Sequence, residues 1–286
     1  MQEFIDNIKT RFQNGTIVEK LIYINIAVFI IDILLATFSG LYNQQLGIVK
    51  EWFALSSSID TFIYKPWTLI SYGFLHSGFL HILFNCIWLY FFGRLFLEYF
   101  TPKQLLNFYI YGTIFGGILF LLSMNYFPVF TNRSHYLVGA SAGVSAIMIG
   151  VATYIPNYQL KFRFIGYVKV WHIAAVVILL DVIQLAGNNG GGHFAHLGGA
   201  LFGFLYVYFA SNKEIDVFKN FSSIFTKKKN TPLKTVHKSG NTRKKPVFQK
   251  SDNQQKTDGI LDKISKSGYD TLTKEEKEFL FKQGKN

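Results

Sequence analysis

The sequence predicts an all-α polytopic membrane protein with a polar C-terminal tail. Half of the residues are hydrophobic and 30 of them are Phe. The apolar residues gather into runs long enough to cross a hydrocarbon layer roughly 30 Å thick. Lys and Arg, in contrast, concentrate after residue 211. The composition therefore indicates a membrane domain followed by a segment of different character.

Six apolar runs define the expected membrane spans. Because lipid offers no partner for backbone N–H and C=O groups, each run is expected to be a helix. The predicted spans are Leu21–Phe38, Ser77–Leu97, Leu105–Tyr126, Ser141–Ile155, Val168–Ala186 and Phe194–Ala210. We therefore expect a six-helix bundle over residues 21–211.

The N-terminal segment, residues 1–20, reads as an amphipathic helix at the membrane surface. Apolar Phe4, Ile5, Ile8 and Phe12 alternate with basic residues, as in helices that lie in the interface. No apolar run with a small-residue cleavage site precedes the first span, so we expect that span to stay in the protein.

The short loops carry their Lys and Arg mainly on one side of the predicted bundle, including Arg94, Lys103 and Lys161. By the positive-inside rule, both termini are then cytoplasmic. The single cysteine, Cys86, falls within a span and excludes an intrachain disulfide.

The tail has two expected parts. Residues 212–256 are rich in Lys, Thr, Asn and Ser, a composition typical of a disordered linker. Residues 212–286 hold 18 of the 29 Lys and Arg and nine Asp and Glu, a net charge of +9. The basic runs predict contact with anionic lipid, worth about 1 kcal/mol per residue near the surface. Nucleic-acid binding is not expected, because aromatic interleaving and a recognisable binding fold are absent.

Residues 257–286 are predicted to form a small cytoplasmic helical hairpin. Asp258 is a candidate N-cap for a first helix, and Ser267-Gly268 is a stop signal. Thr273 and Glu276 form a capping-box pattern before a second apolar stretch.

Two polar side chains in the predicted spans point to chemistry. Ser141 opens the fourth span and His196 lies near the start of the sixth. A hydroxyl or an imidazole in hydrocarbon is costly, so such residues usually face the bundle interior or a watery cavity. They either serve a functional site or only hydrogen-bond between helices.

Spans two, four and six run in the same direction, so their N-terminal ends share one membrane face. At 1.5 Å per residue, His81, Ser141 and His196 each lie roughly 20–22 Å above the far end of their helix. The three side chains are therefore expected at similar depth, about a third of the way in from the outer face.

The fourth span has only about fifteen residues, too few to cross. The chain before it must enter the membrane plane without helical hydrogen bonds, which is tolerated only inside protein or beside a water-filled cavity. Small residues on the fourth and sixth spans predict close helix packing. They are Ala142, Ser145 and Ala146 on one and Ala195, Gly199 and Gly203 on the other.

Three motifs resemble the signature of rhomboid intramembrane serine proteases of the bacterial six-helix type. The first is Gly139-Ala140-Ser141, the second is Ala195-His196-Leu197-Gly198-Gly199 with Gly203 four residues on, and the third is His76 followed by His81-Ile82-Leu83-Phe84-Asn85. The resemblance covers residues 20–211 and implies a multi-pass protein of the bacterial cytoplasmic membrane. Pro66-Trp67 and the pair Gly93 and Glu98 also resemble the family.

The resemblance implies a Ser-His dyad that cleaves transmembrane protein substrates near the outer face through an acyl-enzyme. Ser141 is then the nucleophile and His196 the general base. His81 and Asn85 would complete an oxyanion hole, and His76 would hold water or shape the cavity. No cofactor and no metal are implied.

Several alternatives stay open. Ser145 also follows a Gly-x pair and is a rival nucleophile. Zinc binding by the histidines is disfavoured because no His-Glu-x-x-His motif and no nearby acidic residue is evident. A catalytically inactive rhomboid-like protein would bind membrane clients without cutting them. Asp32 and Asp181 in the spans are read as interhelical hydrogen-bond partners rather than as a transport path.

The chain between spans five and six, residues 187–192, is read as a mobile glycine-rich cap over the site. Span five beside it is the expected lateral gate for a substrate helix. What orients His196 is left open by the sequence.

Overall fold

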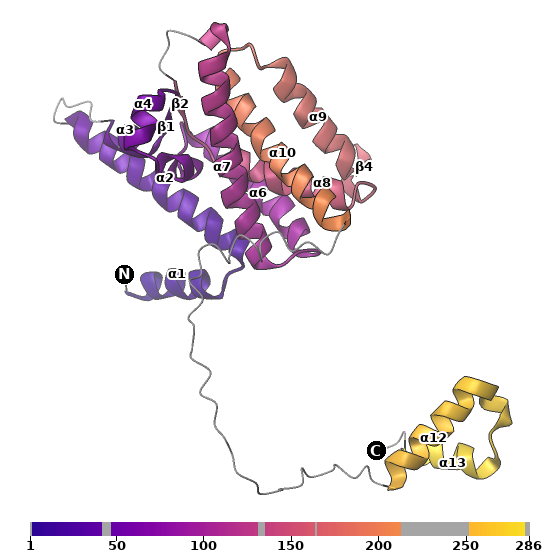
Figure 1. Ribbon diagram of the computed structural model, residues 1–286. Coiled ribbons are helices and arrows are strands. Elements are labelled where there is room, and N and C mark those ends of the chain that lie inside the picture. Colours follow the sequence, from indigo (N-terminus) through magenta and orange to yellow (C-terminus); the bar gives the residue numbers. More distant parts are fainter. Residues whose placement is uncertain (1, 42–46, 131–134, 164, 213–251, 284–286) are drawn as a thin grey trace, which may run out of the picture. The chain divides into compact units, whose positions relative to one another are not determined.

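A computed structural model describes residues 2–41, 47–130, 135–163, 165–212 and 252–283 (Figure 1). The chain divides into two compact units, residues 1–227 and 228–286. The first unit holds ten helices among its described residues: α1 Gln2–Asn14, α2 Ile17–Leu41, α3 Ile48–Phe53, α4 Ile59–Tyr64, α5 Thr68–Ser71, α6 Phe79–Leu97, α7 Pro102–Tyr126, α8 Ser141–Tyr154, α9 Val170–Ile183 and α10 Gly190–Asn212.

The fold is mostly helical, with two small sheets that the all-α prediction did not include. β1 (Leu55–Ser56) pairs antiparallel with β2 (Tyr136–Leu137), and β3 (Gln159–Phe162) pairs antiparallel with β4 (Gly166–Lys169). Two 3₁₀ turns, η1 (Tyr72–Phe74) and η2 (Pro128–Phe130), complete the first unit.

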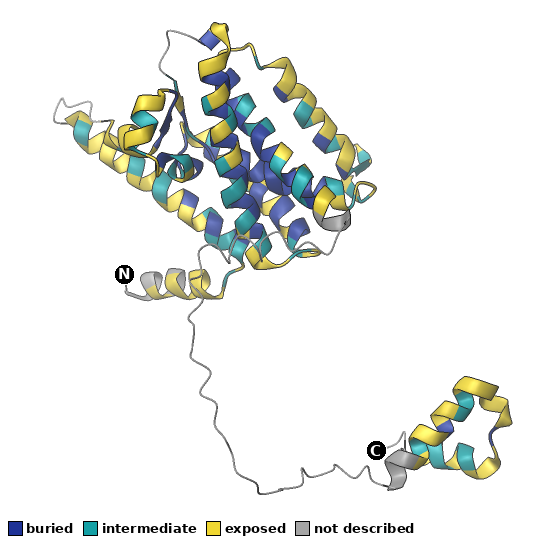
Figure 2. Cartoon of the chain, viewed as in Figure 1, coloured by how far each residue is buried: buried dark blue, intermediate teal, exposed yellow. Residues whose placement is uncertain are grey.

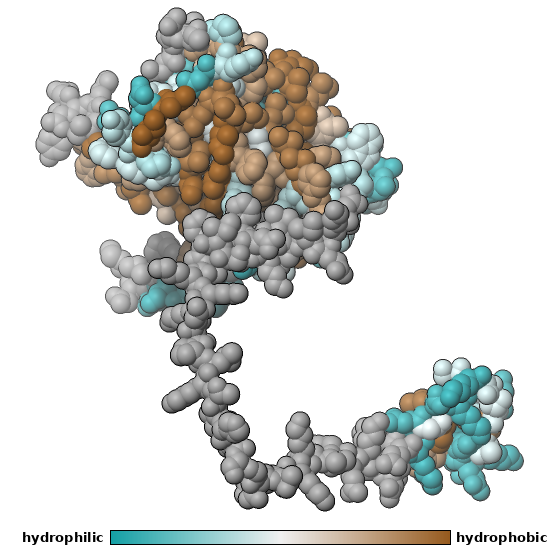
Figure 3. All heavy atoms as spheres, in the orientation of Figure 1, coloured by the Kyte–Doolittle hydropathy of each residue, from teal (hydrophilic) through white to brown (hydrophobic). Residues whose placement is uncertain are grey.

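Among the described residues, three helices, α2, α6 and α7, are long and apolar enough to cross a membrane. α8 and α9 are apolar but have only 14 residues each. The short α8 agrees with the expectation that the fourth span does not cross by itself, while the count of six spans stays a prediction. The visible face of the bundle is largely apolar (Figure 3), as expected for a surface in contact with lipid.

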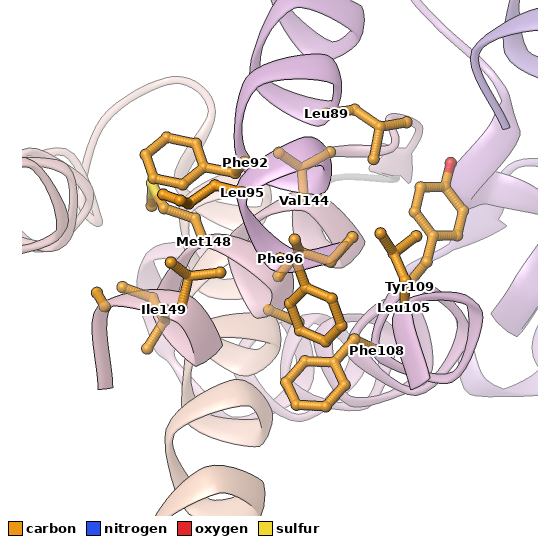
Figure 4. Close-up of a cluster of buried hydrophobic side chains, with 14 of the residues drawn as sticks. Leu89, Phe92, Leu95, Phe96, Leu105, Phe108, Tyr109, Val144, Met148 and Ile149 are labelled. Carbon is orange, nitrogen blue, oxygen red and sulfur yellow. The ribbon is translucent and has the colours of Figure 1, made fainter. Parts of the chain in front are cut away.

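Burial is greatest where α8 lies among its neighbours, whereas α2 and α9 expose much of their length (Figure 2). Eleven of the 14 residues of α8 are buried. Its apolar side chains form one cluster with aromatic and aliphatic side chains from α6 and α7 (Figure 4). That cluster includes Phe92 and Phe96 of α6, Phe108 and Tyr109 of α7, and Val144 and Met148 of α8.

Small residues bring α8 and α10 into backbone contact, as predicted. A methyl group built on Gly199 would collide with the carbonyl oxygen of Ala142, and one on Gly203 with that of Ala146. A third helix joins this packing: a methyl group on Gly116 of α7 would lie 2.6 Å from the Cβ of Ala142. The small-residue stripe of α7 was not predicted.

The chain enters α8 through buried, hydrogen-bonded backbone. β2 pairs Leu137 with Leu55 of β1, and the N–H of Gly139 donates to the carbonyl of Tyr72 at 3.0 Å. The Tyr72 hydroxyl in turn donates to the carbonyl of Thr113 on α7 at 2.6 Å. The non-helical segment thus finds its partners in protein, as its depth in the membrane requires.

Some predicted boundaries are wrong. The N-terminal segment 1–20 is divided by a capping box in which Thr16 and Glu19 bond reciprocally, so α2 begins at Ile17. Span five begins at Val170, because Val168 belongs to β4. Span six begins at Gly190, four residues earlier than predicted.

The C-terminal unit contains α12 (Asp252–Ser267), the 3₁₀ turn η3 (Tyr269–Thr271) and α13 (Lys274–Gln283). α12 begins at Asp252, so Asp258 is not its N-cap and the predicted boundary at 257 is wrong. Gly268 ends α12 at φ +83°, and Thr273 and Glu276 form the predicted capping box. Most of the predicted linker, residues 213–251, and its lipid contact lie outside the described residues.

Candidate active site

A cavity of about 770 Å³ opens between the start of α6, the segment before α8 and the start of α10. Every predicted site residue lines it: His76, His81, Asn85, Ser141 and His196. The rival Ser145 is buried and does not line the cavity. His81, Ser141 and His196 thus meet at one cavity, as the helical-rise argument expects, while their depth in the membrane stays a prediction.

The hydroxyl of Ser141 lies 2.7 Å from Nε2 of His196, a short hydrogen bond between residues 55 positions apart. Ser141 is the first residue of α8. At that position backbone N–H groups have no intrahelical acceptor, and the helix dipole is positive. The hydroxyl thus sits beside both a base and unused donors.

Gly139 shapes the approach to Ser141. Its φ of +134° is rarely adopted by other residues, and a Cβ built there would lie 2.9 Å from Nε2 of His81 and 3.4 Å from Oγ of Ser141. Only a glycine lets the chain turn into α8 at this distance from the His81 ring. The same measurement places the Nε2 edge of His81 beside the Ser141 hydroxyl.

The hydrogen bonds of His81 define which ring nitrogen faces the site. Its Nδ1 accepts the N–H of Ser77 at 3.4 Å and lies 3.0 Å from the Ser77 hydroxyl. An accepting Nδ1 assigns the proton of the neutral ring to Nε2. That nitrogen is then a donor aimed at the space beside Ser141.

Asn85 lies one turn further along α6, and its amide donates to the His81 carbonyl at 2.9 Å. One N–H of that amide is therefore used within the helix, and one remains for the cavity. Asn85 is buried and lines the cavity, so it shares the face of His81 as the spacing of four residues predicts.

His76 is buried, and within the described residues neither of its ring nitrogens has a hydrogen-bond partner. Its ring meets that of His81 edge-on at 5.2 Å between centroids. Both ring nitrogens are closed off from solvent, although the residue lines the cavity. Of the two roles that the family resemblance implies, the position of His76 fits shaping the cavity better than holding water.

The glycine-rich connection before α10 is only partly the cap that was predicted. Asn188, Asn189, Gly191 and Gly192 line the cavity. Gly190, Gly191 and Gly192, however, are buried and form the first turn of α10. Gly191 packs so closely on α7 that a Cβ would lie 2.7 Å from the Phe120 ring.

Asp181 of α9 is the site residue that the sequence analysis did not assign. One of its oxygens, Oδ1, lies 2.8 Å from Nδ1 of His196 and 2.7 Å from Nδ1 of His193. The prediction that Asp181 is an interhelical hydrogen-bond partner is confirmed. Asp32 has no hydrogen bond among the described residues. The signal for Asp181 was its place in a membrane helix, but nothing in the sequence paired it with His196.

Asp181, His193 and His196 also form a donor set suited to a metal, contrary to the expectation that no acidic residue is near the histidines. Tetrahedral ligands about 2.0–2.1 Å from a zinc ion stand more than 3 Å apart. Here both nitrogens approach the same oxygen to within 2.8 Å. The distances fit two N–H···O hydrogen bonds better than a shared ion.

The fold and the site define a class of protein: a membrane-embedded helical bundle with a Ser-His pair beside a polar cavity. The comparison with protein families gives the particular family. Residues 64–213, more than half of the chain, match the Rhomboid domain, and the chain belongs to the rhomboid family. Residues 248–284 match a family of unknown function, DUF6576.

Three relatives illustrate the similarity. RHOMBOID-like protein 12, mitochondrial, from Arabidopsis thaliana is 31% identical over 144 residues, or 46% of this chain and 43% of the relative. Presenilin-associated rhomboid-like protein A, mitochondrial, from Danio rerio is 27% identical over 47% of this chain and 35% of the relative. RHOMBOID-like protein 4 from Arabidopsis thaliana is 30% identical over 49% and 33%. The chain thus spans less than half the length of these relatives.

The comparisons contradict the predicted location in a bacterial cytoplasmic membrane. The relatives come from a plant and a fish, and two of them are named as mitochondrial proteins. The bacterial membrane was implied by the resemblance to the six-helix type, and loop charges could not correct it, because they report which side of a membrane a loop faces but not which membrane it is.

Proposed function

We propose that this rhomboid-family protein is an intramembrane serine protease that hydrolyses a peptide bond of transmembrane protein substrates. The observation that carries the proposal is the 2.7 Å contact between Ser141 Oγ and His196 Nε2 beside a cavity in the membrane domain. A hydroxyl is a weak nucleophile until a neighbouring base takes its proton, and this distance permits the transfer.

In the first half of the reaction, Ser141 Oγ attacks the carbonyl carbon of the scissile bond while its proton passes to His196 Nε2. The tetrahedral intermediate collapses as the C–N bond breaks, and His196 gives that proton to the leaving nitrogen. The product is an ester between Ser141 and the N-terminal part of the substrate.

The negative oxygen of the intermediate needs donors that are in place beforehand. The free N–H groups of the first turn of α8 and Nε2–H of His81 meet beside Ser141 and are the proposed oxyanion hole. The second amide N–H of Asn85 is the proposed additional donor.

Deacylation requires water within a membrane protein. The cavity supplies the space, and His76 is one of the residues that line it. His196 then removes a proton from water, the resulting hydroxide attacks the ester, and Ser141 regains its proton. No cofactor takes part in the proposed reaction.

The proposed substrate is a transmembrane segment cut near the membrane face at which α6, α8 and α10 begin, because the dyad lies close to those helix starts. Cleavage needs an extended strand, so segments that unwind easily near that face are favoured. We propose entry beside α9, whose buried residues in the described chain are only Val170, Ala174 and Asp181.

The test uses the full chain in liposomes with a fluorescent transmembrane substrate and a fluorophosphonate probe. Wild-type protein is expected to cleave the substrate and to be labelled at Ser141. Ser141→Ala is expected to abolish both, and His196→Ala to reduce both to background while the protein stays folded. Gly40→Ala, on a part of α2 with open space around it, serves as the control variant.

A wild-type protein that is folded, binds a transmembrane segment and shows neither labelling nor cleavage would identify an inactive rhomboid-like client-binding protein instead. Cleavage that persists in Ser141→Ala would also overturn the proposal.

A further inference from the structure

The general base of a Ser-His dyad must keep its imidazole in one orientation, and the carboxylate of Asp181 lies where it can hold the ring of His196. Nε2 of His196 meets Ser141 at 2.7 Å, and Nδ1 of the same ring meets Asp181 Oδ1 at 2.8 Å. The three residues come from α8, α10 and α9. The imidazole is thus held at both nitrogens by different helices.

We infer that Asp181 is a positioning residue for the proposed reaction: it fixes the ring of His196 through Nδ1–H and balances the charge that the ring acquires during catalysis. The inference rests on the proposed protease function, and it makes the dyad a three-membered chain of Ser141, His196 and Asp181.

The tautomer follows from the contacts. An ionised carboxylate only accepts hydrogen bonds, so the nitrogen that faces Asp181 carries the proton. Nε2 of the neutral His196 ring is then unprotonated and has a lone pair directed at the Ser141 hydroxyl. The opposite tautomer would place a proton where the proton of Ser141 must go.

His193 completes the arrangement from the same helix as His196. Its Nδ1 lies 2.7 Å from the same oxygen, Asp181 Oδ1, and the two imidazole rings meet nearly edge-on at 5.7 Å between centroids. A second N–H donor lowers the cost of keeping a carboxylate charged in this buried place. His193 therefore supports Asp181 and does not itself contact Ser141.

The position of Asp181 on α9 suits this role. The buried residues of α9 are Val170, Ala174 and Asp181, which lie on one face because they are four and seven residues apart. Asp181 lies two residues before the end of α9 and is bonded to both histidines. The same carboxylate thus ties this end of α9 to α10.

The experiment compares Asp181→Asn, Asp181→Glu, His193→Ala and Val170→Ala in the full chain in liposomes. We expect Asp181→Asn to lower kcat by roughly 10²- to 10⁴-fold, the range of a mispositioned general base, with KM within about threefold of wild type. Asp181→Glu, which keeps the charge, should recover part of the rate. His193→Ala should cost only roughly 3- to 10-fold, the effect of one hydrogen bond.

Val170→Ala controls for a merely structural role, because it loosens the opposite end of the buried face of α9 and touches no histidine. It should lower thermal stability and leave kcat of the folded protein near that of wild type. The ¹⁵N shifts of labelled histidine give a second measurement: His196 of the wild type should carry its proton on Nδ1, and Asp181→Asn should lose that preference.

An Asp181→Asn protein with wild-type or faster turnover would overturn the inference, since the carboxylate would then only restrain α9. Equal loss of kcat in Asp181→Asn and Val170→Ala would also overturn it. Failure of the protease proposal is recognised separately: in that case Ser141→Ala cleaves as well as wild type, or the wild type does not cleave at all.

Discussion

Gly199 of α10 lies directly against the backbone carbonyl of Ala142 on α8. This contact sets the spacing of the two helices one residue after Ser141 and three residues after His196. The short serine side chain reaches the imidazole only because no Cβ stands between the backbones. The close packing of α8 on α10 therefore also determines the geometry of the candidate site.

Replacing Gly199 should damage both stability and activity. In Gly199→Ala the new methyl group must displace the Ala142 carbonyl, so we expect a loss of about 1–3 kcal/mol in unfolding free energy and a fall in cleavage of at least tenfold. Thermal unfolding in detergent and cleavage in liposomes measure the two effects. Gly40→Ala is the control, because a Cβ there meets nothing within 4 Å, and it should change neither stability nor cleavage. A Gly199→Ala protein with the stability and cleavage of Gly40→Ala would contradict the packing argument.

The nucleophile can be distinguished from its neighbour. Ser145 is buried one turn after Ser141 and has no hydrogen bond to His196. We expect Ser145→Ala to retain fluorophosphonate labelling within about threefold of wild type, since only a buried hydroxyl is lost. Mass spectrometry of the labelled peptide should place the adduct on Ser141. Labelling that survives in Ser141→Ala and disappears in Ser145→Ala would reassign the nucleophile.

The two side-chain donors of the proposed oxyanion hole, His81 and Asn85, should contribute unequally to kcat. Nε2–H of His81 is free to face the site, whereas one amide N–H of Asn85 is already bonded to the His81 carbonyl. Loss of one oxyanion donor costs about 10²- to 10³-fold in kcat. We expect His81→Ala to lower kcat by a factor in this range and Asn85→Ala to lower it by a smaller factor. Steady-state kinetics with one substrate decide the order, and a larger effect for Asn85→Ala would reverse the assignment.

The C-terminal hairpin should lose stability in acid. The backbone N–H of Thr273 and the Lys263 ammonium hold the pKa of the Glu276 carboxyl below its usual value. A lowered folded-state pKa means that the charged group stabilises the hairpin above its ordinary pKa of about 4.3. That stabilisation is lost as the pH falls through the lowered value.

Amide hydrogen exchange of α12 and α13 in the full chain measures this effect. After correction for the intrinsic rate, protection at neutral pH should exceed protection at about pH 3. Glu276→Gln should reduce protection at neutral pH and make protection less dependent on pH. Glu278→Gln, on the same helix, should behave as wild type. An unchanged pH dependence in Glu276→Gln would refute the role of this carboxyl.

The membrane class, the rhomboid motifs, the meeting of His81, Ser141 and His196, and the small-residue contact between α8 and α10 could all be predicted from the sequence. Each depends on local information: hydropathy, helical rise and side-chain size. Helix ends were predicted less well, because Val168 pairs with Leu160 in β4, and Gly191, in the first turn of α10, packs on Phe120 and Met124 of α7.

The residue that holds His196, in contrast, became evident only from the packing of the helices. Asp181 lies 15 residues before it, on another helix, and no spacing rule predicts which of two membrane aspartates will face an imidazole. The choice depends on how α9 is rotated and placed against α10, which is set by the buried face of the whole helix. Asp32 of α2, an equally plausible candidate by composition, also lines the cavity, yet it has no hydrogen bond to an imidazole among the described residues.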